Sequence, residues 1–310
     1  MLQVVPVPAT GAEDVVVGTH GRHEGAVFTG TEDGSIWRIS HDARRIDRVA
    51  ATGGRPLGIE YAADGSLVVC DAHRGLLRVD PDTGTCEVLT DRVDGVPLLV
   101  TNNAALAADG TIWFSDSSRV HPLEEWRRDF ARDTRTGRLL RRDPDGRVEV
   151  VLDGLAFANG VALAADESFV TVAESGGRTV VRRWLVDGPV GERVGNTDLL
   201  VGDLPGYPDN TSLGSDGLIW VTIASPVVAM VTVLHRGPRW LRVAATSVPE
   251  RLQPQPRRLA RVQAYAADGA LVHDLDLPAT EFHMVTGVRE HHGTVWLGSL
   301  LEAAVATTRL

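Results

Sequence analysis

The sequence predicts an all-β protein, a six-bladed β-propeller, because one segment plan recurs along the chain. Four segments follow it closely: 57–70, 102–115, 159–173 and 209–222. Each begins with a marker residue, continues with alternating apolar residues and reaches an acidic turn seven positions later, after which a second apolar strand follows. Self-similarity at a spacing of roughly 40 to 50 residues is typical of propeller blades.

Two further repeats, near the ends of the chain, fit the plan less cleanly. Glu13 precedes a His20-Gly21 turn, and Val285 precedes a His292-Gly293 turn. In a propeller the innermost strands of all blades surround one central channel. We therefore expect six equivalent positions to meet near the axis: Glu13, Leu57, Asn102, Asn159, Asp209 and Val285.

Period-two alternation and turn residues divide the chain into successive blades. The first four are expected at about 13–51, 56–91, 100–153 and 158–201. The fifth begins at Tyr207 and is expected to take its outer strand from VQAYA (262–266). The sixth begins near Phe282 and has room for about three strands, so the N-terminal run LQVVPV should supply the fourth and close the ring. Residues 1–310 are thus expected to form a single propeller domain.

Two insertions interrupt the blades. Segment 121–134 reads as a short helix, with Trp126 and Phe130 on one face. Segment 225–258 holds an apolar run, PVVAMVTVL, and an Arg- and Pro-rich stretch, PERLQPQPRR. Because long loops in compact repeat proteins are usually functional or mobile, we expect both to cover one mouth of the channel. Surface decoration is the alternative for both, and contact with a membrane surface is a further alternative for 225–258.

Composition excludes several classes of function. The chain has 310 residues and a formal charge of −10, which argues against a nucleic-acid partner. All 31 basic residues are arginine, so Schiff-base catalysis by lysine is excluded. The sequence contains no run of roughly 18 apolar residues, so it predicts no membrane-spanning helix. The first residues lack a basic region and a long apolar core, so we expect a cytoplasmic protein.

Cys70 and Cys86 are the only cysteines. They fall on the second and fourth strands of one blade, and strands two apart lie roughly 9.5 Å from each other. That separation is beyond the reach of a disulfide, so two free thiols are expected.

The marker positions contribute two carboxylates and two carboxamides that should meet near the axis. Such an oxygen-only set suits a hard cation, with Ca²⁺ first and other divalent cations possible, whereas Zn²⁺ would call for His or Cys. The expected ligands are Glu13, Asn102, Asn159 and Asp209. Neighbouring Asp14, Asn103 and Asn210 would orient them. The alternative is that these residues only make Asx turns before strands.

Other catalytic motifs are missing from the sequence: there is no G-x-S-x-G elbow, P-loop or dinucleotide fingerprint. The histidines at 73, 283, 291 and 292 are candidates for proton transfer, although a propeller histidine can equally be a structural hydrogen-bonding residue. His283 is the best candidate, because it precedes the inner strand of the sixth blade and should lie near the channel mouth.

Four runs resemble strictosidine-synthase-like proteins: FANGVALAADESFVTVAE (157–174), LPGYPDNTSLGSDGLIWV (204–221), NNAALAADGTIWFSDSS (102–118) and REHHGTVWLGSL (289–300). The wider superfamily includes gluconolactonases and senescence-marker lactonases, paraoxonases and diisopropylfluorophosphatases. The resemblance covers nearly the whole chain. It implies a six-bladed propeller with a metal, usually Ca²⁺, in the channel, and it carries the ligand positions onto Glu13, Asn102, Asn159 and Asp209, with Asn210 as a further candidate.

One position departs from that resemblance. Strictosidine synthases use a glutamate at the start of the last inner strand, where this chain has Thr286. We therefore expect a Ca²⁺-dependent hydrolase acting on a small molecule, a lactone or related ester, whose carbonyl the metal polarises. Asp209 would activate water or attack directly, and His283 would shuttle a proton. A strictosidine-type condensing lyase and a non-catalytic metal-binding propeller remain open as alternatives.

Overall fold

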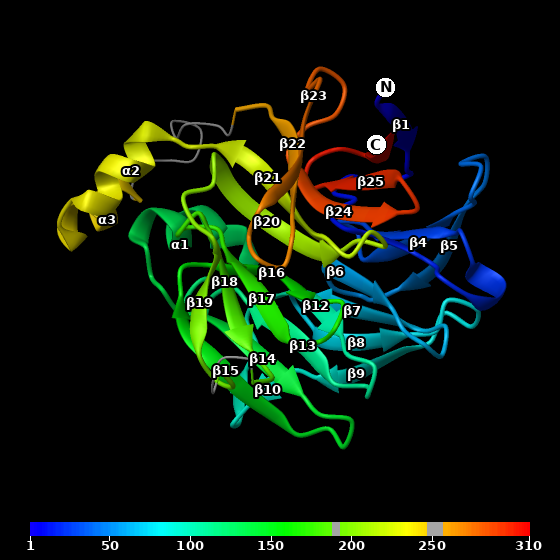
Figure 1. The fold of residues 1–310 in the computed structure, drawn as a ribbon, viewed down its shortest axis with the longest axis horizontal. Helices are drawn as coiled ribbons and strands as arrows, with labels where there is room; N and C mark the ends of the chain where they lie inside the picture. Colours follow the sequence, from blue (N-terminus) through cyan, green and yellow to red (C-terminus); the bar gives the residue numbers. More distant parts are fainter. Residues whose placement is uncertain (188–192, 247–256) are drawn as a thin grey trace.

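The computed structural model describes residues 1–187, 193–246 and 257–310. These residues form six four-stranded antiparallel sheets arranged around a common axis (Figure 1). The predicted six-bladed propeller is confirmed. The inner strands of the six blades are β2 (Val15–Val17), β6 (Pro56–Tyr61), β12 (Thr101–Leu106), β16 (Ala158–Leu163), β20 (Gly206–Leu213) and β24 (Val285–His291).

The remaining strands follow outward in sequence order in each of the first five blades. They are β3 (Val27–Gly30), β4 (Ser35–Ile39) and β5 (Ile46–Ala51); β7 (Leu67–Asp71), β8 (Gly75–Val79) and β9 (Cys86–Thr90); β13 (Ile112–Asp116), β14 (Gly137–Arg142) and β15 (Val148–Leu155); β17 (Phe169–Glu174), β18 (Thr179–Trp184) and β19 (Thr197–Val201); β21 (Ile219–Pro226), β22 (Ala260–Tyr265) and β23 (Leu271–Leu277). A small hairpin of β10 (Arg92–Val93) and β11 (Val96–Pro97) follows the second blade.

One strand assignment in the fifth blade was wrong. The run VQAYA lies in β22, the third strand, and the outer strand is β23, Leu271–Leu277. In the structure β22 is almost wholly buried, whereas β23 is exposed or half-buried along its length. The long insertion between β21 and β22 hides the position of the third strand, because strand spacing no longer predicts it.

The N-terminal strand closes the ring, as the sequence predicted. β1 (Gln3–Pro6) pairs antiparallel with β26 (Ala304–Arg309), so that the last blade reads β24, β25 (Thr294–Ser299), β26 and β1 from the axis outward. The N- and C-termini consequently lie close together in Figure 1. This pairing covers the edge that β26 would otherwise expose. A single domain over 1–310 is compatible with the closure and stays a prediction.

The acidic turns explain why the inner hairpins form where they do. In each of four blades the aspartate accepts a hydrogen bond from the backbone N–H two residues later, at 2.8–3.0 Å, for Asp64, Asp109, Asp166 and Asp216. Such Asx turns bring the chain back on itself. The next residue has a positive φ, +85° at Gly65 and +55° at Glu167, so Glu167 adopts the left-handed backbone that glycine favours.

Hydrophobic clusters join each blade to the next. Phe28 and Ile36 of the first blade pack with Ile59 and Leu67 of the second, and Trp220 of the fifth packs with residues of the sixth. Because each sheet buries its faces against two neighbours, the ring has a continuous core. Cys70 is buried in β7, Cys86 lies in β9, and both are free thiols, as expected.

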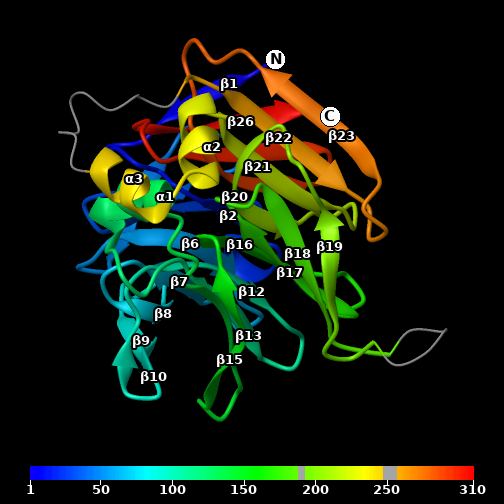
Figure 2. The ribbon, with the colours of Figure 1, turned by 90° about the vertical axis from the view of Figure 1, so that its left-hand side faces the viewer.

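Both insertions form helices on the same side of the propeller (Figure 2). The first contains the 3-10 turn Leu123–Glu125 and α1 (Trp126–Arg132), which confirms the predicted helix. The second contains α2 (Ala229–Arg236) and α3 (Arg239–Ala245), whereas most of the PERLQPQPRR stretch lies outside the described residues. The His235 ring bonds to the carbonyl oxygen of Phe130 at 2.7 Å, which joins α2 to α1.

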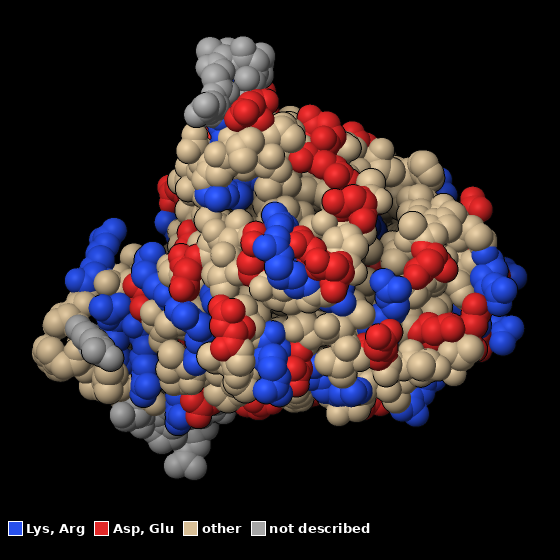
Figure 3. Space-filling model, turned by 90° about the horizontal axis from the view of Figure 1, so that it is seen from below, with Lys and Arg blue, Asp and Glu red and all other residues tan. Residues whose placement is uncertain are grey.

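The surface at the helices carries many basic side chains. Basic side chains are frequent at the left end in Figure 3, the end at which α1, α2 and α3 lie in Figure 1, although the net charge is −10. Val233 and Trp240 are 63% and 70% exposed there. Contact of this segment with a membrane surface stays an alternative. Of the helices described, none is long and apolar enough to cross a bilayer.

Candidate functional site

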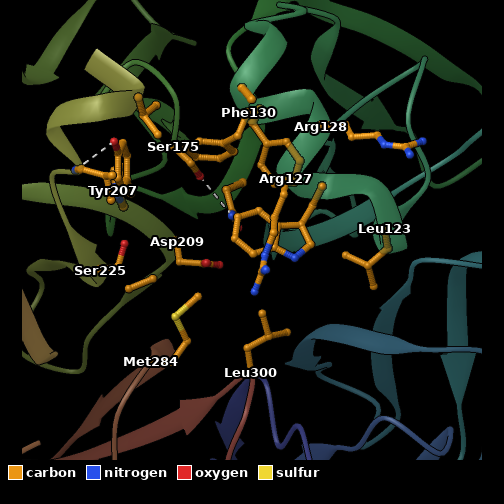
Figure 4. A pocket seen from close by; sticks show the side chains of 18 of the residues that line it. Leu123, Arg127, Arg128, Phe130, Ser175, Tyr207, Asp209, Ser225, Met284 and Leu300 are labelled. Carbon is orange, nitrogen blue, oxygen red and sulfur yellow. Dashed lines mark hydrogen bonds between the residues drawn. The ribbon is translucent and has the colours of Figure 1, made fainter. Parts of the chain in front are cut away.

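The inner strands and the helices enclose a cavity of about 360 Å³ at one mouth of the channel. All four predicted metal ligands line it together: Glu13, Asn102, Asn159 and Asp209. Leu57 also lines the cavity, and at the sixth marker position the lining residue is Met284, the neighbour of Val285. Figure 4 shows the Asp209 carboxylate pointing into the middle of this space. The repeat positions therefore meet as the propeller geometry requires.

Both marker amides, those of Asn102 and Asn159, have side-chain oxygens without a hydrogen-bond partner among the described residues. The Asn102 amide nitrogen donates to Ser117 Oγ at 3.0 Å, and that of Asn159 donates to Ser175 Oγ at 3.2 Å. The Oδ1 atoms of Asn102 and Asn159 are buried and have no hydrogen-bond partner among the described residues. A buried carbonyl without a partner is unfavourable by roughly 1–3 kcal/mol. Two such oxygens beside carboxylates suit a cation that binds through oxygen.

The two marker carboxylates are difficult to ionise together. Burial, then the charges of Asp209 and Asp14, raise the pKa of Glu13 well above its ordinary value. Asp209 is partly exposed to the cavity, and removal of its carboxylate from bulk water raises its pKa from 3.8 to about 7. The charge of Asp14 adds to this rise, and a hydrogen bond from Asn159 opposes it. A positive charge between Glu13 and Asp209 would stabilise both as anions.

The donor set fits a hard divalent cation. Two carboxylates and two free amide oxygens are what Ca²⁺ takes from proteins, with water or substrate completing its six to eight ligands. Across the ranges that the structure describes, no group of three or more His, Cys, Asp or Glu side chains is placed to hold a metal. The set therefore offers no His or Cys cluster of the kind that zinc prefers. Its role as a ligand set stays a prediction.

Asn210 and Asn103, which follow marker residues in the sequence, differ in what they contact. The Asn210 amide donates to both oxygens of Glu13, at 3.2 Å each, so it contacts a predicted ligand directly. Asn103 instead donates to Asp14 at 3.2 Å and accepts from the Val161 backbone at 2.7 Å. Asn103 thus joins neighbouring inner strands without reaching the cavity residues themselves.

The structure does not bring the candidate histidines to this cavity. His283 is not among the described residues that line it, and its Nδ1 bonds to Glu302. His73 pairs with Glu124 at 2.8 Å on the surface. His291 and His292 line a separate depression. The predicted proton-shuttle role of His283 stays a prediction.

Sequence reasoning missed the apolar walls of the cavity. They consist mainly of Leu57, Leu123, Trp126, Phe130, Phe157, Tyr207, Met230, Leu234, Met284 and Leu300. Phe130 contacts two other rings, with centroids 5.4 Å from Phe157 and 5.3 Å from Tyr207. A usable signal was present, because Phe157 and Tyr207 each stand two residues before a marker, at Asn159 and Asp209.

Further along the inner strands, an ion pair crosses the channel. Arg289 of β24 bonds to Glu60 of β6, and the side chains are 13% and 14% exposed. Arg289 also acts on the buried Asp14, whose pKa burial raises to about 7 while the guanidinium opposes that rise. Thr286 is fully buried nearby and donates to the backbone oxygen of Glu13 at 2.8 Å.

The fold and the cavity together place this chain among six-bladed propellers whose candidate site lies on the propeller axis. Residues 19–237 match the family described as the SMP-30/gluconolactonase/LRE-like region. Because this match covers more than half of the chain, the chain belongs to that family, and the resemblance inferred from the sequence is confirmed.

Individual relatives agree with this assignment. Strictosidine synthase-like 6 of Arabidopsis thaliana is 30% identical over 315 residues, covering 94% of this chain and 81% of that protein. A gluconolactonase structure from Xanthomonas campestris superposes with a TM-score of 0.70 at 18% identity, covering 100% of this chain and 89% of that one. A calcium-binding regucalcin structure from Agrobacterium tumefaciens gives 0.66 at 12%, covering 97% and 90%. At such identities the two structures show the shared fold alone.

Proposed function

We propose that this protein is a Ca²⁺-dependent hydrolase of a lactone or related ester. The observation that carries the proposal is the pair of buried, unpaired amide oxygens, Asn102 Oδ1 and Asn159 Oδ1, beside two carboxylates with raised pKa values. Family membership and the resemblance to a gluconolactonase and a calcium-binding regucalcin support it. The enclosed cavity favours a small-molecule substrate.

The cavity residues have two proposed roles, binding the cation and transferring a proton. Glu13, Asn102, Asn159 and Asp209 would hold the cation, which when bound supplies a Lewis acid for the substrate carbonyl. Asp209 faces the open space, so it can accept a proton from an attacking water or attack the carbonyl carbon itself. In the first route the ring or ester C–O bond breaks, and the leaving oxygen takes up the proton that Asp209 accepted from water. In the second route the same bond breaks to leave the acyl group on Asp209, and a water then hydrolyses this anhydride, which frees the carboxylate and supplies the proton for the leaving oxygen.

A hydrolysis panel tests the proposal directly. The purified protein is assayed against lactones, aryl esters and phosphotriesters, first as isolated, then after chelation, then after adding Ca²⁺ back. We expect lactone or ester hydrolysis that disappears with chelator and returns with Ca²⁺. Hydrolysis that is indifferent to verified metal removal would contradict a role for the cation.

The condensing enzyme remains the second candidate, because a relative at 30% identity is named strictosidine synthase-like. Thr286 argues against it, since its hydroxyl is buried and bonded to a backbone oxygen and offers no carboxylate. Condensation of an arylethylamine with an aldehyde by the unmodified protein would favour this candidate. Tight Ca²⁺ binding without turnover of any substrate would favour the non-catalytic propeller.

His283 is tested separately by His283→Gln. A drop in kcat with unchanged Ca²⁺ affinity would support the proposed proton shuttle. An unchanged kcat would assign the His283–Glu302 pair to the structure of the last blade.

A further inference from the structure

We propose that the cavity selects lactones or esters that carry an extended apolar substituent and discriminates against polyhydroxylated sugar lactones. This inference rests on the proposed hydrolase function and adds the substrate class. It depends on the apolar walls of the cavity. The floor of the cavity is formed by the predicted ligands Glu13, Asn102, Asn159 and Asp209 and is a separate part of the site.

The walls are mainly apolar and come from both the propeller and the inserted helices. Phe130 of α1 packs edge-on to Tyr207 and tilted against Phe157, so three rings form one surface. Met230 and Leu234 of α2 add to this wall. Figure 4 shows Phe130 and Tyr207 on one side of the cavity and Met284 and Leu300 on the other. An apolar substituent placed here would leave water for an apolar surface, which is favourable in proportion to the area buried.

The hydroxyl groups in the lining are already engaged within the protein. Thr246 Oγ1 donates to the Val243 carbonyl at 2.7 Å, and Ser175 Oγ accepts from Asn159 at 3.2 Å. Tyr207 Oη accepts from the Val228 backbone at 3.3 Å. Arg127 and Arg128 also line the cavity, but Arg128 pairs with Glu125 at 2.6 Å and Arg127 lies over the Trp126 ring at 5.4 Å. A substrate with hydroxyls on several ring carbons would therefore lose hydrogen bonds to water and find few replacements above the floor.

Two apolar lining residues occupy a backbone conformation that disfavours side chains. Phe157 has φ of +61° and Met284 has φ of +51°, both in the left-handed region. Glycine adopts this region without strain, whereas a residue with a Cβ does not. Each residue immediately precedes an inner strand, β16 or β24, and contributes its side chain to the cavity. Strained residues that face a cavity are typical of binding sites.

The arrangement also orients the substrate. The amide oxygens and the Asp209 carboxylate lie on inner strands, and Glu13 lies just before β2. The helices contribute the apolar walls of the same cavity. The reacting carbonyl therefore faces Asp209, and the substituent extends toward Phe130 and Leu234. A volume of about 360 Å³ falls at the lower end of the range for small-molecule sites, so one medium-sized molecule fills it.

A matched lactone series tests the inference. We compare kcat/KM, with saturating Ca²⁺, for δ-valerolactone, δ-octalactone, δ-decalactone and δ-gluconolactone. Each methylene that enters the walls should raise kcat/KM by about fourfold until the cavity is full. We expect δ-gluconolactone to fall roughly a hundredfold below δ-decalactone.

Two neighbouring residues of α2 provide matched variants. Leu234 lines the cavity, whereas Val233 is 63% exposed and is not among the described lining residues. Leu234→Asn should flatten the dependence on chain length and change δ-valerolactone little. Val233→Asn, with the same new side chain on the same helix, should leave the whole series unchanged.

The possible outcomes separate the substrate class from the hydrolase itself. Hydrolysis of δ-gluconolactone at or above the rate of δ-decalactone would overturn the substrate class and leave the hydrolase proposal standing. If no lactone is hydrolysed, the hydrolase proposal fails, and calorimetric binding of the lactam 6-pentylpiperidin-2-one against δ-valerolactam still tests the walls. Equal affinity for the two lactams would overturn the inference, and tighter binding of the pentyl compound that Leu234→Asn weakens would support it.

Discussion

The side-chain amide of Asn210 donates to both carboxylate oxygens of Glu13, at 3.2 Å each, although 197 residues separate them in the sequence. The two residues belong to the fifth and first blades, so the contact spans the site between inner strands. One donor group shared by both oxygens fixes the plane of the carboxylate. The side-chain oxygen of Asn210, Oδ1, is buried and has no hydrogen-bond partner among the described residues. Asn210 therefore positions Glu13 within the candidate cation site.

Replacement of Asn210 by Ala should weaken Ca²⁺ binding by roughly ten- to hundredfold, because groups that orient a ligand are often worth that much. Isothermal titration calorimetry measures the affinity. Asn103→Ala is the matched control: Asn103 bonds to Asp14 and the Val161 backbone, so it should cost stability more than affinity. Equal losses of affinity in both variants would contradict the distinction between the two residues.

Removal of the cation should lower the melting temperature. Glu13 and Asp209 repel each other when the site is empty, and a ligand that binds only the folded state stabilises it by about 2.7 kcal/mol at one hundred times its Kd. Differential scanning calorimetry with chelator, then with excess Ca²⁺, measures the shift. An unchanged melting curve after metal analysis shows complete removal would count against the site.

The stability of the metal-free protein should fall as pH rises from about 4 to about 7. The pKa of Asp209 is raised from 3.8 to about 7, so within this window the folded protein holds a proton that the unfolded chain has released. Above pH 7 both states are ionised at Asp209, and its contribution becomes constant. The gain in melting temperature from Ca²⁺ should accordingly be larger at pH 8 than at pH 5.

Asp209→Asn isolates this effect, since asparagine does not titrate. The variant should show a shallower decline in stability between pH 4 and 7 when metal-free. Some decline should remain, because the pKa of Asp14 is also raised to about 7 and that of Glu13 is raised as well. A pH profile identical to that of the unmodified protein would contradict the raised pKa of Asp209.

Asp209→Asn should also reduce hydrolysis by roughly 10² to 10⁴-fold, since it removes both a negative charge on the cation and the group that accepts a proton. Initial rates at saturating Ca²⁺ measure the loss, and circular dichroism checks the fold. The control is Asp198→Asn, on the outer strand β19, where the carboxylate pairs with Arg182 at 2.7 Å. Asp198 is not among the described residues that line the cavity. Full activity in the Asp209 variant would refute its assigned role.

Breaking the ion pair between Glu60 and Arg289 should destabilise the folded protein. Arg289→Met leaves the Glu60 carboxylate largely buried without its partner, which should lower the free energy of unfolding by about 3–5 kcal/mol. Urea unfolding measures it. The double variant Glu60→Gln with Arg289→Met should recover much of the loss, because the Glu60 charge is then absent and only Asp14 still lacks the Arg289 charge. A double variant no more stable than Arg289→Met would show that packing, and not charge, causes the loss.

Much of the fold follows from the sequence because each blade is a local unit. The acidic turns place the inner hairpins, and the short last segment implies that β1 must complete the sixth blade. The exception, the order of strands in the fifth blade, arises because a long insertion separates β21 from β22, so that spacing does not locate the third strand. Repetition also identifies Glu13, Asn102, Asn159 and Asp209 as a group, since equivalent residues on inner strands converge at the axis.

By itself, then, the sequence determined the repeat, the closure of the ring and which oxygens face the cavity. Only the tertiary structure decided what those residues touch: Asn210 with Glu13, Arg289 with Glu60, and His283 with Glu302 away from the cavity. It also decided the apolar walls, where α1 and α2 meet Phe157 and Tyr207. The physical reason is that periodicity encodes direction within one blade, whereas contacts across the axis depend on how six twisted sheets and two insertions pack together.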